Sequence, residues 1–480
     1  MDVTNNKYIH MKSIFKFTLL TFVCSLTFSC FEDNDDTISG ITDIKDFVWN
    51  AMNFAYLYKD NSPNLANDRF GSDSDYQRFL NGYEYPENLF ESLIYRRDSV
   101  DRFSWITNNY IALQQQFSGV TKTSGAEFNF FEVPGSENNM FGIVRLVKPN
   151  SNASTTSLTR GQIFNKIDGI QLSKANVRAL LSNESYTLNL ATYNTNGTDI
   201  PEDDNLINGT ETIALTKTVY SENPIFKTEI LNVNNEKVGY LMYNGFVADY
   251  DVQLNAVFAE FQAENIQRLV LDLRYNPGGS VNTAIALGSM ITGLSSGTFA
   301  KLQYNSDLQS SNSSYDFKST LSENVAINSI GLDKVYVIAT GSSASASEMI
   351  LNSLSPYISV VHIGTETVGK SQASITLYDS PDFQRQGANP GHLYALQPLV
   401  AKTVNKDNLP VPPSGLIPTI KIKEDVSNYG VLGDPNEPLL AAALGAIQTG
   451  RLRFAYDVTG MNPILDSNSF KPHSQEMYLD

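Results

Sequence analysis

The chain has 480 residues, of which 41% are hydrophobic and 18% charged, a composition typical of globular proteins. This length predicts about two to four domains. The 51 acidic residues outnumber the 34 Lys and Arg residues, so the net charge is −17. The excess of acid argues against nucleic-acid binding and against a polybasic membrane patch, because both need a basic surface.

Residues 1–30 are typical of an export signal. The apolar run Phe17–Phe28 is too short to span a bilayer comfortably. The segment ending at Cys30 resembles the cleavage box of a bacterial lipoprotein, and the alternative is an ordinary signal peptide cut near Ser29. The resemblance implies lipidation of Cys30, an acidic tether over residues 31–40 like that of Bacteroidetes-type lipoproteins, and export across the inner membrane. A lipid would then anchor the protein to the outer membrane, facing the periplasm or the cell surface.

Cysteine and histidine usage predicts no metal and no cofactor. Cys24 and Cys30 are the only cysteines, so the mature fold has neither a disulfide nor a cysteine-based metal site. The four histidines are scattered without the spacing of a metal site.

Residues 41–116 predict a helical N-terminal region. Apolar residues recur at helical spacing through Ile41–Lys59, and a second helix is expected from Pro86. Asp101–Gln116 either closes this helical cap or is a spacer without substrate contact.

Residues 117–217 predict a β-rich module. Arg160–Leu172 resembles a characteristic turn of bacterial PDZ domains, which bind a C-terminal peptide by adding it as a strand to a sheet edge. The resemblance assigns peptide binding to Gly125, Ala126 and Phe128. Glu127 would repel a carboxylate there unless its side chain points away. The alternative is a module that only supports its neighbours.

Residues 218–450 predict an α/β domain with a mostly parallel sheet, because strands alternate with helices. Expected elements are the strands Val238–Phe246 and Leu269–Tyr275 and the helices Asp251–Ala263, Val281–Ile291 and Gly433–Ile447. The Ser- and Asn-rich Lys301–Asn324 is expected to be a surface insertion near the active site, either a flap or a passive loop. Residues 451–480 form a C-terminal extension without a predicted role.

A serine cluster, GSSASASEMI (Gly341–Ile350), follows the predicted strand Val335–Thr340 and leads into a helix. A hydroxyl at such a turn lies beside the free amides of the helix start. From the local sequence alone, the candidate nucleophiles are Ser342, Ser343, Ser345 and Ser347.

Ser-Ala-Ser-Glu followed by Gly-Lys at this spacing resembles the carboxyl-terminal processing proteases, the tail-specific or S41 serine peptidases. LVLDLRYNPGG (Leu269–Gly279) agrees, and the resemblance extends from about Asn81 to Ala442. It implies a crotonase/ClpP-like α/β core beside the PDZ-like module and the helical cap. It assigns the nucleophile to Ser345, the general base to Lys370, a helper role to Glu348, and backbone oxyanion donors to Gly278, Gly279 and Ala346.

Ser–Lys chemistry requires a neutral lysine. A free lysine has a pKa of about 10.4, and lowering this to neutrality takes about 4 kcal/mol of desolvation. An ionised Glu348 would oppose that change, so its role is positional, or it only completes a helix capping box with Ser345. His362 invites a Ser–His interpretation but is better explained as a packed histidine in an apolar strand.

The resulting hypothesis is a serine endopeptidase that cleaves proteins or peptides with unstructured C-termini. No nucleic-acid partner is expected, and the oligomeric state is not predicted. One alternative is a catalytically silent PDZ-containing peptide-binding lipoprotein. Another is hydrolysis of a non-peptide ester or amide.

Overall fold

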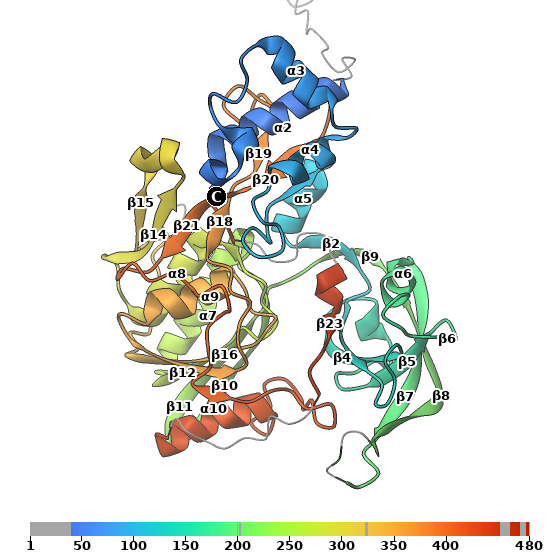
Figure 1. The fold of residues 1–480 in the computed structure, drawn as a ribbon. Helices are drawn as coiled ribbons and strands as arrows, with labels where there is room; N and C mark the ends of the chain where they lie inside the picture. Colours follow the sequence, from blue (N-terminus) through green and yellow to red (C-terminus); the bar gives the residue numbers. More distant parts are fainter. Residues whose placement is uncertain are drawn as a thin grey trace, which may run out of the picture.

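The computed structural model describes residues 40–198, 200, 203–321, 325–451, 461–470 and 477–479. The predictions for Cys30, the signal and most of the acidic tether therefore lie outside the described residues. Figure 1 shows a helical region (blue), a β module (teal to green) and an α/β part (yellow-green to orange). Across the described ranges, no helix has the length and apolarity needed to cross a membrane.

The N-terminal region is helical, as predicted. Its helices are α2 (Ile41–Ala55), α3 (Asp73–Asn81), α4 (Pro86–Leu93) and α5 (Tyr110–Phe117), with β1 (Trp105–Thr107) before α5. The sequence analysis missed α3, whose first turn is polar and capped by the Ser72 hydroxyl accepting from the Asp75 amide at 3.2 Å. β1 pairs with β20 (Ala395–Gln397), which fastens this region to the α/β part.

The β module is built on an antiparallel sheet. Its strand order is β23-β3-β4-β5-β7-β8, with β6 paired to β5. The strands are β3 (Ala126–Glu132), β4 (Met140–Val147), β5 (Ile163–Ile167), β6 (Ile170–Gln171), β7 (Ser185–Asn194), β8 (Asn205–Thr216) and β23 (Leu465–Asp466). One helix, α6 (Val177–Ser182), packs on the same apolar cluster as β3.

The α/β part contains the predicted, mostly parallel sheet. Its order is β10-β11-β12-β16-β17-β22, in which only β10 runs antiparallel to its neighbour. The strands are β10 (Ile225–Val233), β11 (Glu236–Tyr243), β12 (Arg268–Asp272), β16 (Lys334–Ala339), β17 (Ser359–Gly364) and β22 (Ile420–Lys421).

Helices cover both faces of this sheet. On one face lie α7 (Asp251–Ala263), α8 (Val281–Thr292) and α9 (Ala346–Leu354); on the other lies α10 (Pro438–Thr449). Alternate residues of β11 divide accordingly: Leu241 packs with the first group and Tyr240 with α10. The parallel register places the carboxyl ends of β12 and β16 at one edge, where the candidate site lies.

A second sheet lies beside the first, with the order β13-β24-β18-β21-β14-β15. Its strands are β13 (Gly279–Ser280), β14 (Thr298–Tyr304), β15 (Ser313–Asp316), β18 (Gln372–Ser374), β21 (Leu399–Val404) and β24 (Met477–Tyr478). A short sheet joins β19 (Leu377–Tyr378) to β20, and β2 (Val120–Thr123) pairs with β9 (Thr218–Ser221).

The insertion predicted at 301–324 contains regular structure within its described residues, 301–321. Its first residues belong to β14, and a 3-10 helix (Ser306–Ser311) and β15 follow. The Asn305 amide donates to the main-chain oxygens of Phe54 and Tyr56 at 3.1 and 3.2 Å. Its polar residues therefore belong to a hairpin that fastens the helical region to the second sheet.

The described parts of the C-terminal extension return to both halves of the molecule. β23 joins the β module, and η9 (Ser467–Phe470) follows it; β24 joins the second sheet of the α/β part. These strands are two residues long, so each depends on its partner strands for its conformation.

Candidate active site

Ser345 is the residue immediately before α9. Its backbone lies in the left-handed region, with φ 66° and ψ −116°, and its side chain is fully buried. Among the described residues, its hydroxyl has no hydrogen-bond partner. Such a conformation costs a non-glycine residue about 1–3 kcal/mol and is typical of functional sites. Ser345 thus combines a strained backbone with an uncommitted hydroxyl.

The hydroxyls of the other three candidate serines donate hydrogen bonds. Ser343 Oγ donates to the Leu273 carbonyl at 2.7 Å, and Ser347 Oγ donates to the Asn276 carbonyl at 3.0 Å. Ser342 Oγ donates to Asp466 at 2.9 Å. Of the four, Ser345 is the one whose hydroxyl is available for chemistry.

Lys370 is fully buried, just before β18. Its Nζ lies 5.1 Å from the centre of the Phe103 ring, and Arg102 donates to the carbonyls of Val368 and Gly369. The Asp101–Gln116 segment therefore contacts the loop that carries Lys370. Gly369 has a positive φ of 84°, and a Cβ there would lie 2.2 Å from the Pro413 carbonyl oxygen. Both features favour glycine at this position.

Glu348 joins the serine and lysine segments through their main chains. Its Oε2 accepts from the amides of Ser345 and Lys370, both at 2.9 Å, and its Oε1 accepts from Gly369 N at 2.7 Å and from the Thr367 hydroxyl. Burial raises the pKa of Glu348, and these four donors oppose the rise. Only half of the predicted capping box forms, because the Ser345 hydroxyl accepts no bond in return.

The predicted oxyanion donors divide into two groups. The Gly278 amide donates to Asn276 Oδ1 at 2.9 Å, so it already has an acceptor inside the glycine turn. Ala346 begins α9, where main-chain amides lack intrahelical partners. Gly279 has a φ of 136°, and a Cβ there would lie 2.2 Å from the Phe246 carbonyl oxygen, so only glycine fits.

Asn276 is a positioning residue that the sequence analysis did not single out. Its side-chain amide donates to the Tyr243 carbonyl at 2.8 Å, and its main-chain carbonyl accepts from the Ala344 amide at 3.2 Å. It thereby ties the glycine turn to the serine turn. The signal was present in the sequence as the first residue of the Asn276–Gly279 turn.

His362 lies in β17 and is buried. Its Nε2 contacts the Ala339 carbonyl at 3.1 Å, and burial lowers its pKa. These features suit a packed histidine rather than a partner for Ser345. Within the described ranges, no cluster of His, Cys, Asp or Glu is arranged to hold a metal ion.

The residues predicted to bind peptide lie at the start of β3 and just before it. Between them, the Glu127 carboxylate is buried against two buried cations, with Arg145 Nη2 at 3.1 Å and Lys148 Nζ at 3.0 Å. The repulsion expected from Glu127 is therefore neutralised. Arg145 also donates to Ser342 Oγ at 3.2 Å, so it connects this edge with the serine turn.

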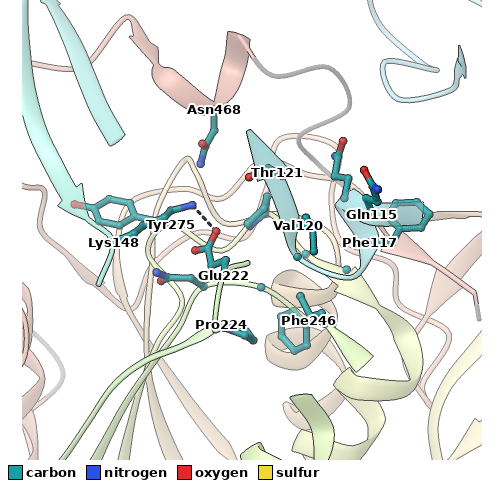
Figure 2. A pocket seen from close by; sticks show the side chains of 18 of the residues that line it. Gln115, Phe117, Val120, Thr121, Lys148, Glu222, Pro224, Phe246, Tyr275 and Asn468 are labelled. Carbon is teal, nitrogen blue, oxygen red and sulfur yellow. Dashed lines mark hydrogen bonds and ion pairs between the residues drawn. The ribbon is translucent and has the colours of Figure 1, made fainter. Parts of the chain in front are cut away.

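A cavity of about 500 Å³ lies between the β module, α5 and the glycine turn. Figure 2 shows Lys148 paired with Glu222 on one side and Phe117 on the other. The lining includes Gly278, Gly279 and two C-terminal residues, Asn468 and Tyr478. Ser345 and Lys370 are fully buried and are not among the residues that line this cavity.

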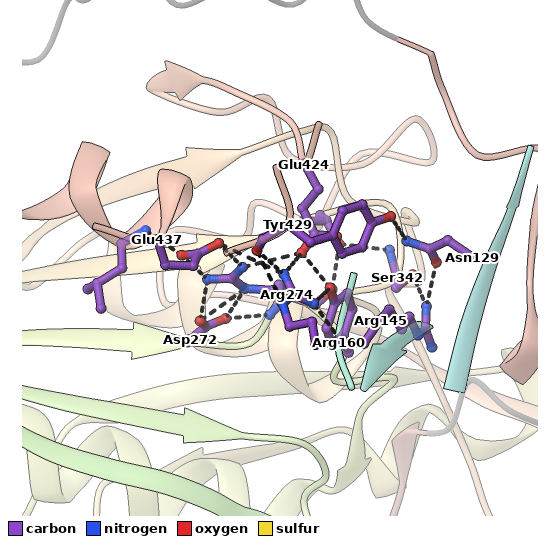
Figure 3. A network of polar contacts seen from close by, with 12 residues as sticks. Asn129, Arg145, Arg160, Asp272, Arg274, Ser342, Glu424, Tyr429 and Glu437 are labelled. Atoms are coloured by element: carbon purple, nitrogen blue, oxygen red, sulfur yellow. Dashed lines mark hydrogen bonds and ion pairs between the residues drawn. The ribbon is translucent and has the colours of Figure 1, made fainter. Parts of the chain in front are cut away.

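A buried ionic network supports the glycine turn (Figure 3). Arg274 is fully buried and donates to both carboxylate oxygens of Asp272 and of Glu437 at 2.6–3.0 Å. Its carbonyl accepts from the Thr340 hydroxyl, which lies at the start of the serine turn. The network therefore holds β12, α10 and both turns of the site together.

Two family profiles match the chain. That of Peptidase family S41 matches residues 237–383, which include Ser345, Glu348 and Lys370, and that of the Peptidase S41 N-terminal domain matches residues 43–105. The chain therefore contains a Peptidase family S41 domain preceded by the N-terminal domain of that family. A crystal structure named "Putative S41 protease from Bacteroides fragilis" has 26% identity and a TM-score of 0.66, covering 84% of this chain and 97% of that one.

Two curated relatives of this chain carry protease names. A "Carboxyl-terminal-processing protease" of Picosynechococcus is 25% identical over 238 residues, 49% of this chain and 48% of the relative. A "Probable CtpA-like serine protease" of Staphylococcus aureus is 26% identical over 140 residues, 29% of this chain and 26% of the relative. The matches span about half and about a quarter of these relatives.

The Ser345 backbone gives a direct stability test. We expect Ser345→Gly to be more stable than Ser345→Ala by about 1 kcal/mol, because glycine relieves the strain of the positive φ and both variants lack the hydroxyl. The same pair at Ser347, inside α9, should reverse the order, with glycine about 0.5–1 kcal/mol less stable. Chemical denaturation measures both pairs, and the same order at the two positions would contradict the strain.

The ionic network gives a second test. Arg274→Met should lower the free energy of unfolding by about 3–5 kcal/mol, because it leaves buried carboxylates without their cation. Arg268→Met, at the start of β12 and shortly before Arg274 in the sequence, is the matched control. Arg268 pairs with Glu236 at 3.2 Å where both side chains are about one-third exposed, so the loss should stay below about 1 kcal/mol. Equal losses in the two variants would show that the network does not stabilise the fold.

Proposed function

We propose that the protein is a serine endopeptidase of the carboxyl-terminal processing type, working with Ser345 and Lys370. The observation that carries this proposal is the shared carboxylate of Glu348, which binds the amides of both residues at 2.9 Å. A strained serine with an uncommitted hydroxyl and a buried lysine are thus held on adjacent main-chain segments.

The chemistry follows from these groups. Ser345 Oγ attacks the carbonyl carbon of the scissile peptide bond, and its proton passes to a neutral Lys370 Nζ. The C–N bond then breaks as Lys370 returns the proton to the leaving amine. Water hydrolyses the acyl-enzyme by the same proton path. Lys370 is fully buried, and a lysine can act as the general base only in its neutral form.

The amides of Ala346 and Gly279 would stabilise the negative oxygen of the tetrahedral intermediate. Loss of one such donor typically costs about 3–4 kcal/mol of transition-state stabilisation. Glu348 acts as a positioning residue, because its described contacts are with the main chain and the Thr367 hydroxyl.

The substrates we propose are proteins or peptides with unstructured C-terminal regions. The β module would act as a PDZ-type domain and add the substrate as a strand along β3, next to Gly125, Ala126 and Phe128. We also propose the lipoprotein route for the whole protein: export, lipidation of Cys30, and attachment to the outer membrane by that lipid.

A catalytically silent peptide-binding protein is the second candidate function. It is favoured by one observation, the complete burial of Ser345 away from the cavity. In that case the module would capture peptides and the serine would never meet them.

Cleavage of an unfolded model protein with an apolar C-terminal tail separates the two functions. We expect Ser345→Ala and Lys370→Met each to lower the rate at least about 10³-fold, because each removes one half of the proton transfer. Intact-mass spectrometry would follow the reaction. Ser353→Ala, another buried serine of α9, is the matched control and should cleave at the wild-type rate.

All variants should keep the wild-type melting temperature within a few degrees. Tail binding without cleavage by the wild-type protein would favour the silent peptide-binding protein. Cleavage that persists in Ser345→Ala would show that another residue is the nucleophile.

A further inference from the structure

The edge of the β module where a peptide would bind is already occupied by the chain itself. β23 (Leu465–Asp466) pairs antiparallel with β3, with Leu465 opposite Phe130 and Asp466 opposite Asn129. The Ile464 amide donates to the Phe130 carbonyl at 2.9 Å, and the Phe128 amide donates to Ser467 Oγ at 2.9 Å. An added peptide strand would need these same main-chain groups.

The direction of this segment is that of a bound C-terminal peptide. As β23 proceeds, its partners on β3 run back from Phe130 toward Gly125, the predicted carboxylate loop. Phe470 then lies against Phe130, with ring centres 5.8 Å apart, and under the Arg178 guanidinium at 5.2 Å. Because Arg178 belongs to α6, the Phe470 ring lies between the strand and the helix of the module.

A carboxylate accompanies the aromatic anchor. Asp466 Oδ2 accepts from Arg145 Nη1 at 3.0 Å and from the Ser342 hydroxyl at 2.9 Å. Arg145 is fully buried, and Ser342 belongs to the turn that carries Ser345. Asn468 also donates to Glu127 at 3.2 Å. The segment therefore uses both the apolar and the charged features of the groove.

The same C-terminal region also reaches the candidate active site. β24 lies between β13 and β18, with Met477 opposite Gly279 and Tyr478 opposite Ser280 and Ser374. Met477 is fully buried, and the Tyr478 ring stacks on Phe117 at 4.2 Å. It thus occupies the space between the glycine segment and the strand that follows Lys370.

We propose that residues 464–470 are an internal ligand of the β module that competes with substrate peptides, so that the described structure is the self-blocked form of the enzyme. This inference rests on the proposed peptide-binding function. It also defines the ligand class: an extended peptide with a carboxylate that reaches Arg145 and, four residues later, an aromatic side chain between β3 and α6.

The test is binding of a fluorescent peptide with the sequence of residues 461–470 (MNPILDSNSF), followed by fluorescence polarisation in the full chain carrying Ser345→Ala. We expect Phe470→Ala and Asp466→Ala, added separately, each to tighten the apparent Kd at least about 10-fold, because each weakens the internal competitor. Ile464→Ala is the matched control within the segment. Its side chain is 41% exposed and outside the apolar cluster, so it should leave the Kd unchanged.

Hydrogen exchange on the Ser345→Ala chain gives a second measurement that does not depend on the tail variants folding. Saturating probe peptide should speed amide exchange of residues 461–470, because the probe displaces them. Unchanged exchange with the probe bound would overturn the inference. So would equal probe affinity with and without the Phe470 and Asp466 substitutions.

The outcomes separate this inference from the proposed function. Equal probe binding in all variants would show that the module binds peptides but that residues 464–470 do not compete with them. No probe binding in any variant overturns both the internal competition and the peptide-binding role of the module. In a chain with Ser345 intact, faster cleavage by Phe470→Ala but not by Ile464→Ala is the expected result. Competition without any cleavage would sustain the inference while the peptidase proposal fails.

Discussion

The site depends on one buried carboxylate. Ser345 precedes α9 and Lys370 precedes β18, so no regular element holds them together. Glu348 does so by accepting from the main chain of both. A carboxylate can take four donors at once, whereas an amide side chain would turn its own N–H groups toward some of them. Through these two backbone amides, Glu348 fixes the positions of both main-chain segments.

Sequence patterns predicted the helices and strands of the core, since buried strands and amphipathic helices carry their own periodicity. α7 has the predicted bounds, and α8 extends one residue further than expected. Sequence periodicity did not predict the strands whose conformation depends on their partners in the folded protein. β23 and β24 are too short to show any period, and β15 is a polar hairpin strand. Their conformations come from the sheets they join.

The site residues divide in the same way. Local sequence left four serines open, and resemblance to a family selected Ser345. In the structure, the hydroxyls of Ser342, Ser343 and Ser347 donate hydrogen bonds, whereas that of Ser345 has no partner among the described residues. Gly278 could not be assigned from sequence, because its amide direction depends on the Asn276 side chain. The sequence suggested that Glu127 would repel a peptide carboxylate. It could not show that Arg145 in β4 and Lys148 just after β4 would neutralise the Glu127 charge.

The two short C-terminal strands connect the β module with the α/β part. One chain segment pairs with β3 at β23 and with β13 at β24, so its two ends hold each other at high effective concentration. Either strand alone would gain little from a few hydrogen bonds, but neither can diffuse away while the other is bound. A peptide that takes the place of β23 removes that restraint on β24. Displacement of β23 would therefore also loosen β24, which pairs with Gly279 and Ser280.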